Sequence, residues 1–367
     1  MPPDATCRPS PALFTASTFP MARIAIIGAG TAGLTAAYGL RGAPVDVTIF
    51  EKSRGFGGRA ATRGRHGCRY DHGAPYFRTT SARTTRLVTA HLSTEQLVEI
   101  GRPVGTFDAS GTIQPPPPAD DSGPRWTYVQ GISTLGKLLA RQARAEVHRD
   151  TRIETITRRD GRWRLQGPDG RAWTGYDGVV LTPPAPQSAA LLRAATSDAA
   201  LGAVHEALSA VEYAPQFAFA FGYDRRLARP KDCWALKSAA ESHPIDWVGF
   251  ENEKPGHVRA GQTLLVVHTA PSWTEPRVDQ SPETFLGTVK AETAALLDAD
   301  LRQPTWYDTQ RWRYARPRSG LRTDGATTEA AEGLVLAGDF VAGTGKVGAA
   351  LESGLDAAAR LRTLLKV

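Results

Sequence analysis

The stretch Arg23-Ile24-Ala25-Ile26-Ile27-Gly28-Ala29-Gly30-Thr31-Ala32-Gly33 decides the fold of this 367-residue chain. The run that ends at Ile27 is apolar and β-branched, which is typical of a strand buried on both faces. Gly28 permits a tight turn, Gly30 lets a pyrophosphate approach the backbone, and Gly33 lets the next helix pack close to the strand. Residues 31–40 are rich in alanine and leucine and predict that helix. The stretch therefore indicates a dinucleotide-binding strand–turn–helix unit.

An acidic residue follows at the expected distance. Residues 45–50 predict a second strand, and Glu51 stands at its end, where a carboxylate accepts hydrogen bonds from an adenosine ribose. Lys52 follows it directly. The helix that begins at Thr31 and Ala32 offers unpaired N–H groups and positive dipole character to the pyrophosphate. A glycine-rich turn with no ligand is the alternative, but strand, helix and acid in this order favour the dinucleotide.

Two further glycine-containing motifs distinguish between cofactors. Gly57, Gly58 and Arg59 come soon after the second strand, where a nicotinamide-binding unit normally leads into another crossover helix. Such a loop can wrap around a diphosphate, and the Arg59 guanidinium suits phosphate oxygens. Near the other end, residues 334–339 predict a buried strand that closes with Gly338 and Asp339. Together these motifs favour a bound flavin dinucleotide over a visiting nicotinamide cofactor, although residues 53–59 alone are also compatible with an ordinary flexible loop.

Composition excludes several classes of protein. Lys and Arg outnumber Asp and Glu by 44 to 37, a net charge of +7, but no dense basic run with interleaved aromatic residues suggests nucleic-acid binding. The three cysteines, Cys7, Cys68 and Cys233, have neither metal-ligand spacing nor the density of a disulfide framework, which favours a reducing cytoplasm. No run of 18 apolar residues predicts a membrane span. Residues 1–20 lack the pattern of a secretory signal, and we expect a disordered lead with Met21 as a candidate start.

The chain is long enough for two domains. We expect an α/β fold, in which a doubly wound, Rossmann-like FAD-binding domain carries an inserted mixed-sheet substrate domain. Helices are expected over residues 81–100 and 133–145, and a strand over residues 310–316. The FAD-binding domain is expected to be discontinuous, made of residues 21–80, 125–185 and 325–367, with residues 81–124 and 186–324 forming the substrate-binding domain.

At this point the motifs resemble a known family. From about residue 22 to residue 365 the chain is similar to the flavin amine oxidase superfamily, and within it to renalase-type oxidoreductases. The superfamily features are the glycine fingerprint, Gly57-Gly58-Arg59 and Ala337-Gly338-Asp339. The features that resemble renalases are Asp71-His72-Gly73-Ala74-Pro75-Tyr76-Phe77, Gln130-Gly131-Ile132-Ser133, Val180-Leu181-Thr182-Pro183-Pro184, Trp312-Arg313-Tyr314 and residues 346–354. The family often has Gln where this chain has Pro75.

The resemblance implies FAD held non-covalently, and no cysteine after Cys233 is present to form a covalent link. It implies oxidation of the 2- and 6-dihydro isomers of NAD(P)H by hydride transfer to the flavin, with O2 then reduced to hydrogen peroxide and ordinary NAD(P)+ released. It places Glu51 at the ribose and Arg59 along the diphosphate or flavin. The other implied cofactor contacts are Ile153 at adenine, Asp339 at the ribityl or phosphate region, and Val347 and Gly348 at the N1–C2 carbonyl edge of the flavin.

The candidate substrate-pocket residues are Tyr76, His268, Trp312 and Tyr314. His268 ends a predicted strand at a point that resembles the family's histidine, yet a lone histidine is often a core residue. Trp312 and Tyr314 alternate along one strand and are equally typical of core packing. His72 is more simply interpreted as positioning its turn. Asn252, Lys254 and Gly256 are better explained as a solvated loop than as a polar rim.

Three functional hypotheses remain at this stage. The first is the renalase-like oxidase. The second is an amine oxidase or a desaturase-like dehydrogenase, which predicts an aromatic cage for an amine or an apolar helix that faces a membrane. The third is a flavin-containing sensor or a structural relic, whose flavin no dihydronicotinamide isomer would reduce.

Overall fold

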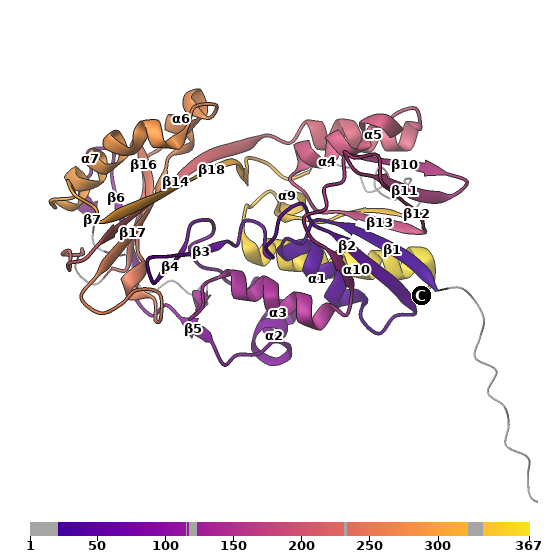
Figure 1. Ribbon diagram of the computed structural model, residues 1–367, viewed down its shortest axis with the longest axis horizontal. Helices are drawn as coiled ribbons and strands as arrows, with labels where there is room; N and C mark the ends of the chain where they lie inside the picture. Colours follow the sequence, from indigo (N-terminus) through magenta and orange to yellow (C-terminus); the bar gives the residue numbers. More distant parts are fainter. Residues whose placement is uncertain (1–20, 115, 117–122, 231–232, 322–332) are drawn as a thin grey trace, which may run out of the picture.

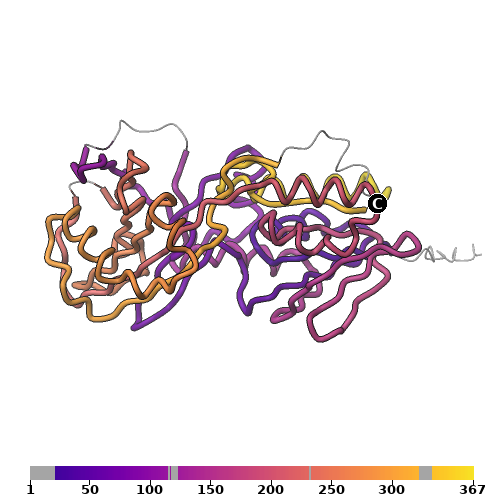
Figure 2. The backbone as a smooth tube through the Cα atoms, turned by 90° about the horizontal axis from the view of Figure 1, so that it is seen from above, coloured from indigo at the N-terminus to yellow at the C-terminus, as the bar shows by residue number. Residues whose placement is uncertain are grey.

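The computed structural model describes residues 21–114, 116, 123–230, 233–321 and 333–367. Two bodies lie end to end along the longest axis, one built on a parallel sheet and the other on a larger mixed sheet (Figure 1), and the view from above shows the same division (Figure 2). The lead expected to be disordered, residues 1–20, lies outside the described residues. Within the described part of the chain, no helix is both long and apolar enough to cross a membrane.

The first body is built on a five-stranded sheet with the order β19-β13-β1-β2-β9, in which every pairing is parallel. The sheet draws its strands from both ends of the chain, as the predicted Rossmann-like fold requires. The prediction of that fold is therefore confirmed. The strands are β1 (Ala22–Ile27), β2 (Val45–Phe50), β9 (Glu146–His148), β13 (Gly178–Leu181) and β19 (Leu334–Leu336).

Both faces of this parallel sheet are covered. Ile24 and Ile26 of β1 join one hydrophobic cluster, and Ala25 and Ile27 join another, because successive side chains of a strand point to opposite faces. Helices pack on the first face, and a small antiparallel sheet with two helices packs on the second. The first layer is α1 (Thr31–Leu40), α3 (Ser133–Ala143) and α10 (Val347–Leu365); the second is β10 (Thr155–Arg159), β11 (Arg162–Gln166), β12 (Ala172–Tyr176), α4 (Ala185–Leu192) and α5 (Ala199–Ser209).

Glycines allow α1 to pack directly against its neighbours. A Cβ atom on Gly33 would lie 2.1 Å from the Gly28 carbonyl oxygen, and one on Gly354 of α10 would lie 2.5 Å from the Ala32 carbonyl oxygen. Neither contact is possible for a residue with a side chain. The N-terminus of α1 is therefore fixed between β1 and the C-terminal helix.

The second body is a seven-stranded mixed sheet with the order β18-β14-β17-β16-β15-β6-β7. Its pairings are antiparallel except for β15 with β6, which is parallel. The long strands β14 and β18 extend from this sheet toward the Rossmann-like body (Figure 1). The strands are β6 (Val104–Phe107), β7 (Ile113–Gln114), β14 (Tyr213–Tyr223), β15 (Ala235–Ser238), β16 (Ile245–Phe250), β17 (Thr263–Thr269) and β18 (Trp306–Pro317).

The two faces of strand β14 differ in the size of their side chains. On β14, Phe217, Phe219 and Phe221 pack into a cluster with residues of helix α7 (Leu286–Leu297). The alternate residues Ala218 and Ala220 face the other way, and Ala220 packs with Cys68 and Tyr70 of the hairpin β3 (Thr62–Arg65) and β4 (Cys68–Asp71). On β14, small residues therefore lie on the side of the sheet against which this hairpin packs.

Several expected elements differ in the structure. The helix predicted over residues 81–100 is wrong beyond residue 91: α2 (Ala82–Arg86) continues as one wide turn (Leu87–His91), and the chain then forms β5 (Leu97–Glu99). β5 pairs with β8 (Trp126–Tyr128), so a partner about thirty residues away overrides the local helical pattern. The predicted last strand is shorter than residues 334–339, because α9 (Asp339–Ala342) begins there. The short elements completing the chain are η2 (Arg193–Ala195), η3 (Glu251–Glu253), α6 (Pro271–Thr274), η4 (Glu275–Arg277) and η5 (Pro282–Phe285).

Candidate functional site

The two glycine clusters predicted to hold the cofactor lie side by side. Gly57 N donates to the Ala29 carbonyl oxygen over 2.9 Å, and Gly58 faces Gly30. A Cβ atom on Gly30 would meet only the Gly58 Cα atom, at 4.0 Å, so there is open space beside this backbone. Helix α1 begins at Thr31 with Gly30 as its cap and no side-chain cap, which leaves the N–H groups of its first turn to face that space.

Glu51 is buried at the end of β2 and holds the turn in place. One carboxylate oxygen accepts the Ala29 N–H over 2.7 Å, and the other accepts the Ser53 N–H over 2.8 Å and the Ser53 hydroxyl over 2.6 Å. An ionised carboxylate offers about four acceptor sites, so one remains for a ribose hydroxyl. The fingerprint acid is therefore positioned both to shape the turn and to bind a ligand.

Lys52 and Ile153 flank this carboxylate. Thr151 N donates to the Glu51 carbonyl oxygen over 2.9 Å, which brings the segment containing Ile153 alongside the end of β2. Ile153 is buried, in the cluster that covers the second face of the parallel sheet. Lys52 is exposed, and its Nζ donates to the Gln187 side chain over 3.2 Å. Ile153 thus lies alongside the end of β2, and Lys52 is exposed to solvent.

Arg59 connects three segments that are far apart in the chain. Its Nη2 lies 2.6 Å from Asp339 Oδ1, an ion pair between the second glycine cluster and the start of α9. Its Nη1 donates to the backbone carbonyls of Tyr314 and Ala315 on β18 over 3.3 and 3.1 Å. The sequence singled out Arg59 and Asp339 as separate cofactor contacts, and the structure makes them partners of each other. Gly338, which precedes Asp339, donates its N–H to the Ser353 hydroxyl over 3.0 Å.

The second helix N-terminus at the site belongs to α10. It begins at Val347 after Lys346, with no side-chain cap, so its first N–H groups are open to a ligand. A Cβ atom on Gly348 would lie 2.4 Å from the Arg78 carbonyl oxygen, which shows how closely this helix start packs against the segment after residue 77.

An aromatic and imidazole group lies on the face of the mixed sheet that bears the small residues. The His72 ring stacks on Trp312 at 5.3 Å between centroids, and Trp312 Nε1 donates to the His72 carbonyl over 2.9 Å. His268 of β17 is the register partner of Ala218 on β14 and of Trp247 on β16. The structure thus brings together His268 and Trp312, two of the expected pocket residues, with His72.

Tyr76 contacts a pair of tryptophans that the sequence analysis did not single out. Its ring centroid lies 6.0 Å from that of Trp234 and 6.1 Å from that of Trp247, and the two tryptophans meet edge to face at 5.4 Å. Trp247 is the cross-strand neighbour of His268. Trp234 directly precedes β15 and Trp247 lies in β16, and no motif in the sequence distinguishes either of them from a core tryptophan.

Burial keeps both pocket imidazoles neutral. Desolvation, reinforced by the Arg63 charge, lowers the pKa of His72 to about 4. Desolvation also lowers the pKa of His268 to about 3, and Arg316 and His72 act in the same direction. Neither side chain carries charge at neutral pH. Among the described residues, four buried polar atoms of this group have no hydrogen-bond partner: His72 Nδ1, Trp234 Nε1, Trp247 Nε1 and His268 Nε2.

Tyr314 has different neighbours. Its ring meets Tyr213 edge to face at 5.5 Å, and both line an open surface cavity of about 450 Å³ with arginine, glutamate and proline side chains. Burial raises the pKa of Tyr213 to about 12, so its hydroxyl stays protonated. Tyr314 therefore borders this cavity and not the group of His72, His268 and Trp312, although it lies only two residues from Trp312 along β18.

Two parts of the sequence match known protein families. Residues 26–90 match the NAD(P)-binding Rossmann-like domain, and residues 119–362 match the family described as flavin containing amine oxidoreductase. The second match spans more than half of the chain. The chain belongs to the flavin-containing amine oxidoreductase family. It is therefore an FAD-dependent oxidoreductase.

Solved structures of low sequence identity share the fold. A protein from Exiguobacterium sp. 255-15 described as a protoporphyrinogen oxidase superposes with a TM-score of 0.75 at 17% identity, covering 94% of this chain and 99% of that one. Cyclohexylamine oxidase from Brevibacterium oxydans IH-35A gives 0.74 at 12% identity, covering 95% and 100%. Putrescine oxidase bound to putrescine gives 0.69 at 14% identity, covering 94% and 100%. At these identities the likeness concerns the fold alone.

The residues present fit FAD. Helix α1 begins without a side-chain cap beside the open space next to Gly30, which suits the diphosphate of a dinucleotide, and α10, which also begins without a side-chain cap, packs against α1 at Gly354. Glu51 retains an acceptor site, and the guanidinium of Arg59 is fixed nearby by Asp339. FAD is the family's redox cofactor, and the site has the parts that would hold it.

Proposed function

We propose that this protein is a renalase-like oxidase, which oxidises the 2- and 6-dihydro isomers of NAD(P)H. The observation that supports the proposal is the group of four neutral, buried and unpartnered polar atoms of His72, Trp234, Trp247 and His268. Unpaired buried polar groups cost about 1–3 kcal/mol each and are expected where a ligand completes them. Neutral donors and acceptors beside stacked aromatic rings suit an uncharged dihydropyridine with a carboxamide.

Each protein group has a defined part in this proposal. The indole N–H groups of Trp234 and Trp247 are donors for the carboxamide oxygen, and His268 Nε2 is an acceptor for its NH2 group in the tautomer that carries the ring proton on Nδ1. The ring of Trp312, backed by His72, gives the dihydropyridine a flat surface to stack on. FAD held at this site would supply the acceptor for the hydride and a path for two electrons to O2, which would give hydrogen peroxide. The protein's contribution is to orient the ring and exclude water.

A charge near the pocket argues against an alkylamine. The ring of Trp234 already has the Lys254 ammonium 5.5 Å from its centroid, the place that a substrate ammonium takes in an aromatic cage. An amine oxidase or a desaturase-like dehydrogenase of the same family is the alternative to the renalase-like oxidase.

Anaerobic stopped-flow measurement of flavin absorbance tests this proposal. The protein is mixed with 2-dihydro, 6-dihydro and ordinary 4-dihydro NAD(P), with putrescine and cyclohexylamine as amine controls. We expect rapid bleaching by a 2- or 6-isomer, and peroxide when air is admitted. Bleaching by an amine alone would move the assignment to the amine oxidases, and bleaching by none of these compounds would overturn the renalase-like proposal.

We also propose that FAD is held by the cofactor-binding residues predicted from the sequence, from Gly28 to Gly348. The proposed division into a discontinuous FAD-binding domain and a substrate-binding domain is supported by the parallel sheet, whose strands come from both ends of the chain. Reoxidation by O2 and a cytoplasmic location rest on the family resemblance and on the few cysteines.

A further inference from the structure

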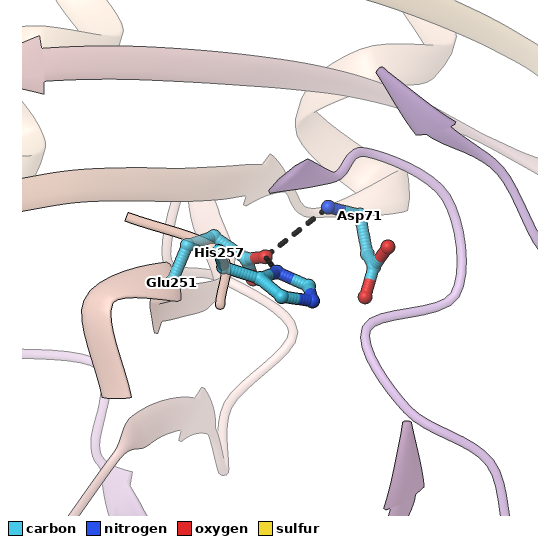
Figure 3. A group of neighbouring side chains, drawn as sticks. All are labelled: Asp71, Glu251 and His257. Carbon is cyan, nitrogen blue, oxygen red and sulfur yellow. Dashed lines mark hydrogen bonds and ion pairs between the residues drawn. The ribbon is translucent and has the colours of Figure 1, made fainter. Parts of the chain in front are cut away.

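Four ionisable side chains are completely buried against the turn that carries His72 and Tyr76. Lys254 Nζ lies 2.9 Å from Asp71 Oδ2 and 2.8 Å from Glu251 Oε1, and His257 Nδ1 lies 2.8 Å from Glu251 Oε2; all four side chains are at most 1% exposed. Figure 3 shows Asp71, from β4, beside Glu251 and His257, from the segment after β16. The cluster therefore joins the hairpin to the mixed sheet.

Asp71, Glu251 and His257 have the donor set of a metal site, with ligand atoms within 4.8 Å of one another. The ammonium group of Lys254 contacts both carboxylates, so the protein supplies the cation itself. Burial opposes the charged form of Lys254, but attraction by Asp71 and Glu251 outweighs it and raises the pKa of this amine. Burial likewise opposes the charged form of Asp71, yet the charges of Lys254 and His257 lower the pKa of its carboxyl.

The partners of His257 define its protonation. Nδ1 faces the Glu251 carboxylate, and Nε2 faces the Tyr128 carbonyl oxygen at 3.1 Å. Glu251 also accepts the Asp71 N–H over 3.2 Å and pairs with Lys254, as an ionised carboxylate does. Both ring nitrogens of His257 therefore face acceptors, and both must donate. A doubly protonated ring is an imidazolium.

The count of charges supports the same assignment. Asp71 accepts from the Thr62 hydroxyl over 2.7 Å, the Ile132 N–H over 2.9 Å and Lys254, which identifies a second carboxylate. Two carboxylates and one ammonium would leave a net negative charge in a fully buried place, and such a charge is costly. An imidazolium at His257 makes the cluster neutral.

The cluster touches the proposed pocket at two points. Asp71 directly precedes His72, whose ring stacks on Trp312. On the other side, Lys254 lies over the ring of Trp234, which packs against Tyr76. The turn between these points is also held by the Ala74 N–H, which donates to the Arg59 carbonyl over 3.0 Å.

We propose that Asp71, Lys254, Glu251 and His257 form a charge-neutral buried quartet, with His257 an imidazolium, that positions His72 and Tyr76 for substrate binding. These four act through the turn and are positioning residues, because none of them is placed against the substrate. The positioning role rests on the proposed function, whereas the protonation of His257 and the charge balance do not. The two parts can therefore fail separately.

The protonation is tested by NMR of the FAD-bound protein with 15N-labelled histidine at pH 7.5. The ring signals that vanish in His257→Gln identify His257. We expect both of its nitrogens to be protonated. One protonated and one bare nitrogen would overturn the imidazolium assignment, whatever the substrate of the enzyme is.

Charge balance is tested with matched variants of the holoprotein. Lys254→Met and His257→Gln each leave one uncompensated buried negative charge, and we expect Tm to fall by about 5–10 °C. The double variant Glu251→Gln/His257→Gln is neutral again and should recover at least half of the loss seen in His257→Gln. A double variant no more stable than the single one would overturn the charge-balance argument.

Positioning is tested kinetically with the substrate that reduces the flavin. In His257→Gln with full flavin content, we expect KM to rise roughly tenfold while the limiting rate of flavin reduction changes much less, because the displaced turn weakens binding rather than hydride transfer. The neutral double variant should restore KM in part. A lower limiting rate at an unchanged KM would contradict the positioning role.

Discussion

At the scale of single residues, the pocket histidines couple stability to pH. Both have a usual pKa of 6.5, and the fold lowers it to about 4 for His72 and about 3 for His268. Between pH 6.5 and 4 these two rings bind protons in the unfolded chain but not in the folded protein. The neutral rings therefore contribute stability above pH 6.5 that is lost as pH falls through this window, on the order of 3 kcal/mol for each ring at pH 4.

The first prediction follows from this linkage. In urea unfolding between pH 7 and 4.5, the free energy of unfolding of the wild type should fall as the pH falls. For His268→Gln, the slope of this free energy against pH should be smaller by an amount that corresponds to about one proton. Carboxylates titrate in both proteins, so the difference between the two slopes isolates His268. Identical slopes would mean that the His268 ring is not held neutral by the fold.

The buried lysine shows where sequence reasoning failed at this scale. Lys254 lies in a polar, Pro- and Gly-containing stretch, which is typical of a solvated loop. Its partner Asp71 is 183 residues away in the chain, and no local sequence pattern predicts that the two side chains pair. Glu51, in contrast, was found because its partner Ala29 lies in the same strand–turn–helix unit.

At the scale of elements, the turn before α1 permits an unusually clean test of cofactor placement. Gly30 has φ −74°, which any residue adopts, and the space beside it is open. Gly30→Val should therefore fold normally but occupy the room proposed for the diphosphate. We expect the purified variant to have lost most of its FAD, as measured by the ratio of flavin to protein absorbance, while its circular dichroism stays unchanged.

Two matched glycine variants complete this second prediction. Gly287→Ala, on α7 with nothing within 4 Å of the added Cβ atom, should keep its FAD. Gly33→Ala should fail to fold well, because its Cβ atom would lie 2.1 Å from the Gly28 carbonyl oxygen. A yellow Gly30→Val protein with full flavin content would contradict the placement of the diphosphate.

Elements were predictable where the information is local. The strand, turn and helix of residues 22–50 carry their own signals, and the structure has them at nearly the expected bounds. The segment of residues 81–100 does not, because β5 exists only through its pairing with β8. Similarly, β18 begins four residues before the predicted strand, since it follows the full length of its partner β14.

At the scale of the whole molecule, the two bodies are joined where β14 and β18 reach the Rossmann-like part. The hairpin of β3 and β4 is tied to β18 by Asp308, which accepts from Arg63 over 2.6 Å and from the Tyr70 hydroxyl over 2.5 Å. Composition and motif spacing predicted an inserted mixed sheet, but the ties between the bodies are side-chain pairs more than two hundred residues apart. Those pairs set the position of the pocket relative to the cofactor site.

The last prediction concerns the Arg59–Asp339 pair, which fixes the second glycine cluster to α9 and, through the carbonyls of Tyr314 and Ala315, to the mixed sheet. We expect Arg59→Ala to destabilise the flavin-free protein more than Asp339→Ala, because it leaves a buried carboxylate without its cation. In a double-mutant cycle by urea unfolding, the coupling energy should be about 1–3 kcal/mol. Each single variant should also weaken FAD binding, and the double variant should be little worse than Arg59→Ala alone. Strictly additive losses would show that the two side chains act independently, and that other contacts hold the bodies together.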